Sequence, residues 1–482
     1  MKFWAFAVAV AVVVFAGIAG SAGATTIKVN TLEDGFDEDG KCALREAVEA
    51  SRKNKKEDSC AKGQTKRDVI ELKGKIYPLI FITSNEDSNV NGDLDFTGGG
   101  PVSVVGKGKG KTEILQNSSD RVIDVQDGGK VTLSKLRLGN GNVAGLGASE
   151  GRGGNARVRG GSLTISKSEV SSSDAVVGGG VYADGGAKLK LKRSVMDGTD
   201  ATVAGGAVGV QSDATATLQR VTVSNTNAIS STEAVRGGVV ASDGGDVRVV
   251  ESTLQASSAT ASGANDGASG GAIYSNGDLL VNRSLIQGNN TDADDDNIAE
   301  HGGGIHAASG DARIVNSTIF NNEAGGPGAN DGLGGGLYVG AADVIVDHTT
   351  FDSNDGSSAG DAIGHTGGSV GIFGSLIDDS VDPCFGTVSS LGFNVSEEED
   401  PQGDCGFIAS DLRDVSTGTV GGLPTDNGGP TLTVAIIATS LARDRVPANL
   451  CKEATDKVDQ RGFVRPKGDA CDAGAFEFNA KP

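Results

Sequence analysis

The sequence predicts an all-β protein folded as a right-handed parallel β-helix, a solenoid of roughly ten coils with a helical cap at its N-terminal end. Two observations lead to this prediction: a glycine-rich repeat, and short apolar runs of strand type within each repeat. Six glycine runs, each followed by an apolar residue, start at Gly178, Gly205, Gly237, Gly270, Gly302 and Gly334. Successive starts lie 27, 32, 33, 32 and 32 residues apart. The apolar runs show no 3.6-residue periodicity, which excludes a helical repeat.

The first 24 residues have the composition of a secretory signal peptide. One lysine precedes an apolar run from Ala5 to about Ala19, and small residues ending at Ala24 follow, so we expect cleavage after Ala24. The alternative is an uncleaved membrane anchor, because about twenty uncharged residues can just span a bilayer. We expect no transmembrane segment after cleavage and a secreted or cell-surface protein.

A helix is expected next, in the stretch CALREAVEAS that begins at Cys42. One helical face carries Leu44, Ala47, Val48 and Ser51. The other positions, expected to point elsewhere, are Arg45, Glu46, Glu49 and Arg52. Because the end of a solenoid exposes strand edges and an open core, we interpret the helix as a cap over the first coil. A catalytic role for Arg45 and Glu46 is the alternative.

Apolar runs place further coils before the glycine repeat. They are VIEL from Val69, VSVVG from Val102, RVIDV from Arg121 and KVTLSKLRL from Lys130. We therefore divide the chain into a signal peptide (1–24), an N-terminal capping region (25–68), the β-helix (69–376) and a C-terminal capping region (377–482).

The six cysteines form three local couples. They are Cys42 with Cys60, Cys384 with Cys405, and Cys451 with Cys471. Disulfides persist in exported proteins. Sequence alone cannot choose among the 15 possible pairings, but each local pairing closes a short loop near an end of the chain, and we predict these three. Zinc is the alternative, although the chain has no C-x-x-C pair.

Two columns of polar residues recur at the repeat spacing. Asn289, Asn322 and Asn354 each follow a buried-type Ile or Phe by three residues, so we expect them to stack as an asparagine ladder. A second column contains Arg193, Arg220, Glu251 and Arg283. We interpret it as a surface ion-pair ladder, because the acid separates cations that would otherwise repel. The alternative is that one of the arginines abstracts a proton, as a lysine or arginine does in lyases of this fold.

The two ends of the mature chain resemble a known group of exported bacterial β-helix proteins. CALREA, followed by DVIELKGKIY, is similar to their CSLREA-type N-terminal region, with Ala43 where serine is usual. SSLGFNV, TDNGGPTLTVAI and DQRGFVRPKGDACDAGAFEF resemble the choice-of-anchor Q region. The resemblance implies a secreted or surface-displayed right-handed β-helix, and the activity of this group is mostly undefined.

Charge and motifs limit the possible chemistry. The formal net charge of −21 argues against nucleic acid or an anionic membrane as the main partner. Asn290-Thr291-Asp292, Asp294 to Asp296 and Gly364-His365-Thr366 are similar to short motifs of galacturonan hydrolases. The first two lie too close together to place carboxylates across a glycosidic bond. We interpret the segment that contains the first two motifs as a solvated loop. We expect no cofactor, apart from a calcium ion that the aspartates of this loop, Asp292 and Asp294 to Asp296, could hold.

One set of residues remains as a candidate binding site: Tyr182, Tyr274, His306 and Tyr338. All four occupy the same repeat position, directly after an apolar residue that should face the core, so strand alternation sends their rings outward. We expect an exposed aromatic strip suited to stacking against sugar rings or a partner protein. The alternative is that the rings merely stack on one another. The predicted function is a binding or structural module, with a glycan or cell-envelope component as partner. The alternative is a polysaccharide lyase or hydrolase.

Overall fold

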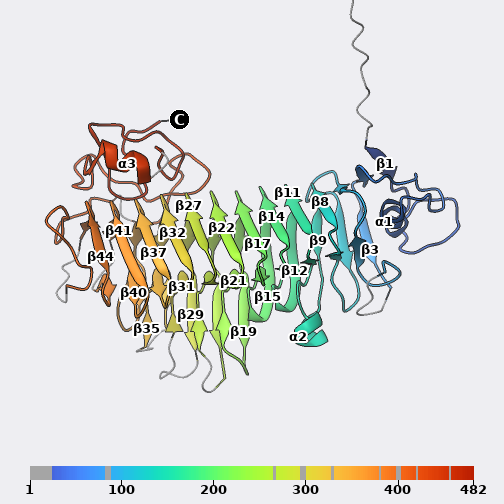
Figure 1. Cartoon of the computed structure of the whole chain (residues 1–482), viewed down its shortest axis with the longest axis horizontal. Coiled ribbons are helices and arrows are strands. Elements are labelled where there is room, and N and C mark those ends of the chain that lie inside the picture. The colour runs from blue at the N-terminus through green and yellow to red at the C-terminus, as the bar shows by residue number, and fades with distance from the viewer. Residues whose placement is uncertain are drawn as a thin grey trace, which may run out of the picture.

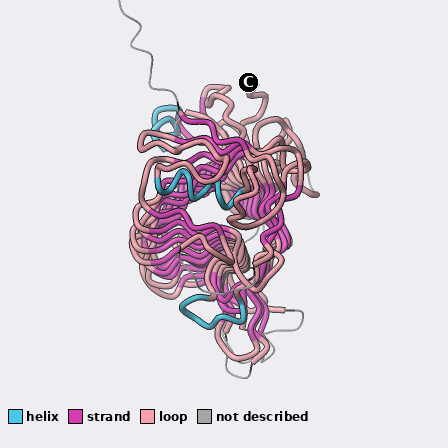
Figure 2. Tube along the Cα trace, turned by 90° about the vertical axis from the view of Figure 1, so that its right-hand side faces the viewer, coloured by secondary structure: helices cyan, strands magenta, loops and turns pink. Residues whose placement is uncertain are grey.

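The computed structural model is a parallel β-helix, as predicted (Figure 1). It describes residues 24–81, 88–263, 267–293, 300–326, 331–378, 382–397, 403–419, 422–454 and 457–481. The predicted signal peptide lies almost entirely outside the described residues. Seen along its length, the coils superimpose on one another (Figure 2). The described part contains more coils than the roughly ten that we predicted, because its longest sheet has 13 strands.

Three parallel sheets form the walls. The 13-stranded sheet consists of β1 (Thr25–Lys28), β2 (Asp68–Glu71), β5 (Val102–Val105), β8 (Lys130–Ser134), β11 (Ser162–Ser166), β14 (Lys188–Lys192), β17 (Thr215–Gln219), β22 (Asp246–Val250), β27 (Leu279–Asn282), β32 (Asp311–Val315), β37 (Asp343–Asp347), β41 (Ser369–Phe373) and β44 (Ser389–Gly392). The 11-stranded sheet consists of β4 (Leu94–Thr97), β7 (Ile123–Gln126), β10 (Ala156–Arg159), β13 (Val181–Asp184), β16 (Val208–Gln211), β21 (Val240–Asp243), β26 (Ile273–Asn276), β31 (Ile305–Ser309), β36 (Leu337–Val339), β40 (Ile363–His365) and β43 (Cys384–Phe385).

The third wall is longer and splits into a main part and a projection. The main part consists of β3 (Ile76–Leu79), β6 (Glu113–Gln116), β9 (Arg137–Gly139), β12 (Glu169–Val177), β15 (Val195–Ala204), β18 (Thr222–Ser224), β23 (Thr253–Gln255), β28 (Leu285–Gln287), β33 (Thr318–Phe320), β38 (Thr350–Asp352), β42 (Leu376–Asp378) and β45 (Val395–Ser396). We call the projection the fin. Its outgoing strands are β19 (Asn227–Ser230), β24 (Ser258–Ala261), β29 (Asn290–Ala293), β34 (Glu323–Ala324) and β39 (Asp355–Gly356), and its returning strands are β20 (Val235–Arg236), β25 (Ala268–Ser269), β30 (Glu300–His301) and β35 (Gly332–Leu333).

Alternation of side chains builds the core. In β14, Leu189 and Leu191 face inward and are buried, whereas the lysines between and beside them face outward. Leu189 pairs with Leu163 of β11 and with Ala216 of β17, so apolar side chains stack directly above one another from coil to coil. These columns merge into one continuous apolar cluster that runs the length of the helix.

The glycine runs mark the point where the fin returns to the 11-stranded sheet. Gly237 has φ +64°, and a Cβ atom there would lie 2.1 Å from the carbonyl oxygen of Val240. A Cβ atom on Gly238 would lie 2.2 Å from the carbonyl oxygen of Gly271 on the next coil. Both positions therefore exclude a side chain, which explains why paired glycines recur in the sequence.

The predicted asparagine ladder is confirmed. The Asn289 side-chain amide donates to Oδ1 of Asn322 at 2.9 Å, and the Asn322 amide donates to Oδ1 of Asn354 at 3.0 Å. The column continues to Ser257, whose backbone N–H donates to Oδ1 of Asn289 at 3.2 Å. Because these residues are buried, the ladder satisfies polar groups inside the turn between the main third wall and the fin.

The helix α1 (Leu44–Lys53) covers the N-terminal end of the core, as predicted. We expected the charged positions of this helix to lie outside its buried face, which is wrong for Arg45, Glu46 and Glu49: all three are buried. Arg45 pairs with Asp34 at 2.7 Å and donates to three backbone carbonyls of residues 91–93. Glu46 accepts the Ala43 backbone N–H at 2.8 Å and so caps the helix. Both side chains have structural partners that the sequence pattern alone does not reveal.

All three predicted disulfides are present, between Cys42 and Cys60, Cys384 and Cys405, and Cys451 and Cys471. Cys405 belongs to the main core cluster, and Phe407 packs against that cluster, so the segment after β45 closes the C-terminal end.

The remaining C-terminal residues include α3 (Ala448–Ala454) and a two-stranded sheet of β46 (Val446–Pro447) and β47 (Ala470–Cys471). They lie along the side of the β-helix (Figure 1). Thr318 of β33 donates to Gln460 at 2.6 Å, and the Ala475 N–H donates to Thr350 of β38 at 3.0 Å. We call residues 415–481 the C-terminal flank. No helix among the described residues is long and apolar enough to cross a bilayer.

Candidate functional site

The four predicted binding residues lie in one column on the outer face of the 11-stranded sheet. Register partners on successive coils define this outer column as Asp95, Asp124, Arg157, Tyr182, Gly209, Ala241, Tyr274, His306, Tyr338 and Gly364. The sequence repeat identified only the aromatic members, because the first three coils carry charged residues at the same position.

The expectation that the aromatic rings form an exposed strip is wrong. Tyr182, Tyr274, His306 and Tyr338 are only 0%, 9%, 8% and 6% exposed. Three of the rings contact one another edge to face: the centroids of Tyr274 and His306 lie 5.2 Å apart, and those of His306 and Tyr338 lie 4.8 Å apart. The rings do point away from the core, but residues of the fin's returning strands cover Tyr274, His306 and Tyr338, and Arg152 covers Tyr182. A role of these residues in ligand binding stays a prediction.

A different side chain of the fin lies over each of two rings. The Arg236 guanidinium of β20 lies 5.1 Å from the centroid of the Tyr274 ring. His301 of β30 stacks on Tyr338, with ring centroids 4.0 Å apart. Burial lowers the pKa of His301 to about 4, and burial with repulsion from His301 and Arg236 lowers the pKa of His306 to about 3. Both rings are therefore neutral at physiological pH.

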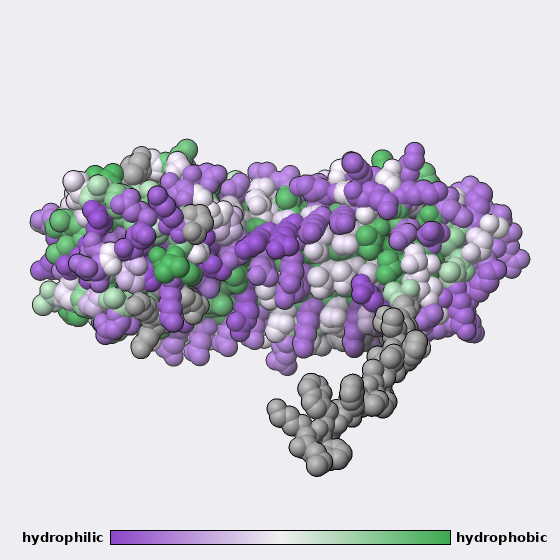
Figure 3. Space-filling view, turned by 90° about the horizontal axis from the view of Figure 1, so that it is seen from above, coloured by the Kyte–Doolittle hydropathy of each residue, from purple (hydrophilic) through white to green (hydrophobic). Residues whose placement is uncertain are grey.

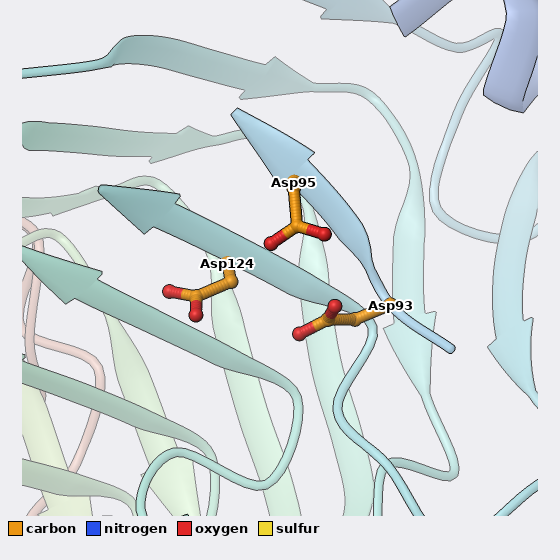
Figure 4. Close-up of side chains that lie close together, drawn as sticks. All are labelled: Asp93, Asp95 and Asp124. Atoms are coloured by element: carbon orange, nitrogen blue, oxygen red, sulfur yellow. The ribbon is translucent and has the colours of Figure 1, made fainter. Parts of the chain in front are cut away.

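The two aspartates of the outer column, Asp95 and Asp124, form a buried carboxylate cluster with Asp93. Asp93, Asp95 and Asp124 each place one oxygen within 4.8 Å of the others (Figure 4). Asp95 and Asp124 are register partners on β4 and β7, and Asp93 directly precedes β4. Carboxylates at this spacing are the groups that could hold a hard cation such as calcium.

Two buried arginines compete with a metal for these oxygens. Arg121 lies 3.2 Å from Asp93, and Arg157 lies 2.6 Å from Asp124. Burial and the neighbouring carboxylates raise the pKa of Asp93 well above its usual value. Because all three aspartates are at most 1% exposed, they cannot reach a polymeric substrate. The arrangement is suited to holding the N-terminal coils together and is not suited to hydrolysis.

A pocket of about 330 Å³ interrupts the outer column between Tyr182 and Tyr274. Gly209 and Ala241 occupy the two intervening coils, so no large side chain fills the space under the fin. Apolar residues of β12, β15, β16 and β21 line the pocket, and charged and amide groups of Gln211, Glu233, Arg236 and Asp243 stand at its rim. The Tyr182 hydroxyl donates to Gln211 at 2.5 Å.

Two further grooves follow the turn between the 13-stranded sheet and the third wall. One, of about 240 Å³, is lined by Lys192, Arg193 and Arg220 among others, and one, of about 380 Å³, extends from Arg220 to the C-terminal flank. Viewed from the side that carries this flank, a band of hydrophilic residues extends between it and the N-terminal end, beside paler and hydrophobic residues (Figure 3). The predicted ion-pair ladder lies here: Glu251 pairs with both Arg220 and Arg283. Arg193 is not part of it.

A larger groove, of about 620 Å³, lies near the C-terminal end and is acidic. Burial raises the pKa of Glu323 at its wall, with repulsion from Asp355 and Asp292 contributing. Of the hydrolase-like motifs, Asp294 to Asp296 lie outside the described residues, so the predicted calcium loop is not described either. His365 lies at the end of β40 and is far in sequence from any carboxylate of that loop.

Sequence reasoning missed the buried charges of the N-terminal coils. Asp95, Asp124 and Arg157 follow apolar residues in LDF, IDV and ARV, at outward positions of three strands in register. Three successive charged residues at one register position, two acids followed by a base, were the available signal. Asp93 and Arg121 lie in loops, where no periodicity marks them.

Comparisons with known proteins add little beyond the fold. No family model matches the chain, and no curated protein matches it. Among solved structures, the crystal structure of pectate lyase Pel9A is similar over 85% of this chain and 88% of that chain, with 16% sequence identity and a TM-score of 0.39. This likeness is too distant to carry an argument about activity.

Proposed function

We propose that this protein is a secreted or cell-surface β-helix that binds a glycan, taking one sugar residue into the pocket between Tyr182 and Tyr274. The observation that carries the proposal is the pocket itself: an apolar lining beneath the fin, with amide and charged groups at the rim. Ligand sites are typically concave, mostly apolar and equipped with a few polar groups that fix orientation. The three disulfides and the resemblance of CALREA to exported proteins support the extracellular location.

A sugar fits this chemistry because its ring has apolar C–H faces and a polar edge. Tyr274, at one end of the pocket, offers a ring, and Arg236 stands over that ring at the rim. Gln211, Glu233 and Asp243 offer hydrogen-bonding groups for hydroxyls. The pocket volume corresponds to a small ligand and not to a long cleft, which favours recognition of a single unit within a chain.

The alternative of a polysaccharide lyase or hydrolase has less support. Glycoside hydrolysis needs two carboxyl groups that flank the substrate bond. The clustered carboxylates of the N-terminal coils are buried and paired with arginine. We therefore propose a binding protein and not a catalyst.

The test is a glycan array run beside a polysaccharide degradation screen. Wild-type protein should bind a subset of glycans and release no new chain ends, with or without calcium. Ala241→Leu should fill the pocket and weaken binding at least tenfold. Arg236→Ser should also weaken binding, whereas the matched control Arg248→Ser, an exposed arginine on β22 of another wall, should not.

Two results would overturn the proposal. Release of unsaturated or reducing ends by the wild type would show an enzyme. Glycan binding by a folded Ala241→Leu variant with wild-type affinity would show that the pocket is not the site, and circular dichroism of the variant would establish that it is folded.

A further inference from the structure

We propose a second binding site, separate from the pocket under the fin: a cationic groove that binds a short segment of an acidic polysaccharide, one carrying carboxylate or sulfate groups. It runs along the turn between the 13-stranded sheet and the third wall. The cations are unexpected there, because the chain as a whole carries a formal net charge of −21.

The turn places one cation on each of four consecutive coils. Lys135, Lys167, Arg193 and Arg220 each follow a strand of the 13-stranded sheet by one residue and adopt a positive φ between 48° and 58°. All four are exposed. Because parallel strands lie about 4.8 Å apart, the four side chains span roughly 14 Å along the helix axis. A linear polymer with regularly spaced anionic groups matches such a row.

Neighbouring residues increase the positive charge at the middle of the row. Lys192 directly precedes Arg193, and Lys190 lies on the same outward face of β14. Repulsion from Lys190, with a contribution from Arg193, lowers the pKa of Lys192. Within the described part of the chain, Lys192 and Arg193 have no carboxylate within ion-pair distance. Their charge is therefore available to an external anion.

The row of cations ends at the coil where Glu251 neutralises the positive charge and the C-terminal flank lies against the turn. Glu251 occupies the next coil and pairs with Arg220 and with Arg283 beyond it. Gly429, Pro430 and Arg461 of the C-terminal flank form the end wall of the groove that starts at Arg220. The cationic part of the groove thus extends over the coils of Ser166, Arg193 and Arg220. Beyond Arg220 it continues into the groove where Glu251 balances the charge and the C-terminal flank forms one wall. The length of the cationic part matches a few sugar units.

The short length also distinguishes a flexible acidic sugar chain from a nucleic acid duplex. A duplex is rigid and would extend beyond the row, where the formal net charge of −21 of the whole chain disfavours a long polyanion. Charges more than about 8 Å away are largely screened for a short ligand at physiological salt. We therefore assign the groove to acidic oligosaccharides.

The experiment measures binding of four probes of similar length to the full mature chain: an oligogalacturonate, a sulfated heparin oligosaccharide, an uncharged malto-oligosaccharide and a single-stranded DNA oligonucleotide. We expect binding of one or both acidic sugars, with affinity that falls as salt rises, and no binding of the uncharged sugar. The two acidic arms distinguish carboxylate from sulfate recognition. Stronger binding of the DNA than of either acidic sugar would overturn the proposal.

Matched double variants locate the site. Lys192→Ser with Arg193→Ser should weaken acidic-sugar binding at least tenfold. The control, Lys130→Ser with Lys188→Ser, removes the same charge from the opposite ends of β8 and β14 and should change affinity less than twofold. Equal loss in both variants would show nonspecific attraction, and no loss in the first would exclude the groove. Ala241→Leu should leave this binding intact, which separates it from the proposed pocket.

Discussion

The two halves of the outer column differ in chemistry although they share one position on every coil. The N-terminal coils carry Asp95, Asp124 and Arg157, and the later coils carry Tyr274, His306 and Tyr338. Both halves are buried. On a solenoid, an outward position is therefore not necessarily a surface position, because the chain between strands can fold back over it.

The segments that lie over each half explain why one half carries charged residues and the other carries aromatic residues. Over the charged half lie the loop before β4 and the short helix α2 (Gly147–Glu150), which follows the 3-10 turn η1 (Ala144–Leu146). Glu150 of α2 pairs with Arg157 at 2.7 Å, and the Asn89 N–H of the loop donates to Asp95 at 2.7 Å. The fin covers the aromatic half with rings and a guanidinium. The charged half thus depends on matched charges, and the aromatic half depends on packing and neutrality.

The largest expected change in the free energy of unfolding follows the removal of one charged side chain from the charged half. Arg157→Ala leaves Asp124 buried without its closest cation and should lower the free energy of unfolding by about 3–5 kcal/mol. Arg159→Ala is the control, because its side chain is 34% exposed and 3.5 Å from the same carboxylate, and should cost about 1 kcal/mol or less. Denaturant unfolding measures both. Similar losses in the two variants would mean that burial does not set the contribution.

Lowering the pH should affect the two halves in opposite directions. An unfolded histidine gains a proton below about pH 6.5, whereas His301 and His306 stay neutral in the folded protein down to about pH 4 and 3. Each ring therefore removes about 2.5 kcal/mol of stability as the pH falls from 7 to 4.5. The raised pKa of Asp93 acts oppositely: ionisation destabilises the folded state at neutral pH, and protonation relieves this cost.

Hydrogen exchange by mass spectrometry at pH 7 and 4.5, corrected for intrinsic rates, can resolve the two halves. We expect weaker protection of β26, β31 and β36 at the lower pH, and unchanged or stronger protection of β4, β7 and β10. His306→Phe should reduce the loss in the aromatic half. A uniform change along the helix would contradict this expectation.

The smallest expected effect lies at Tyr182, where the two halves meet. Its hydroxyl accepts a hydrogen bond from Arg152 at 2.7 Å and donates one to Gln211. Tyr182→Phe keeps the ring and removes both bonds, so the free energy of unfolding should fall by about 1 kcal/mol. Thermal unfolding measures it. A loss as large as that of Arg157→Ala would place Tyr182 in the charged half.

The sequence predicted those features that depend on the coil itself. Gly237 and Gly238 recur because the backbone of a neighbouring segment leaves no room for a side chain, and Asn322 recurs because each coil presents the same buried turn. Such constraints repeat with the coil, so they leave a visible period.

The features that the sequence did not predict arise between segments far apart in the chain. Arg45 looks solvent-facing by helical periodicity, yet the loop at residues 91–93 meets it. Tyr338 looks exposed by strand alternation, yet His301 stacks on it. Neither contact leaves a periodic signal, because the covering segment belongs to a different part of the repeat. The exposure of the candidate site was therefore predicted incorrectly, although its position on the sheet was correct.

The fin also accommodates differences in the length of the repeats. The coil that starts at Gly178 is shorter than those that follow, and there β15 runs unbroken from Val195 to Ala204, whereas the next coils divide this path into three strands joined by longer connections. Added residues leave the glycine junctions and the asparagine ladder in register. The described connection between β19 and β20 is consequently a natural point for grafting: a foreign peptide inserted there would be displayed on a disulfide-closed scaffold.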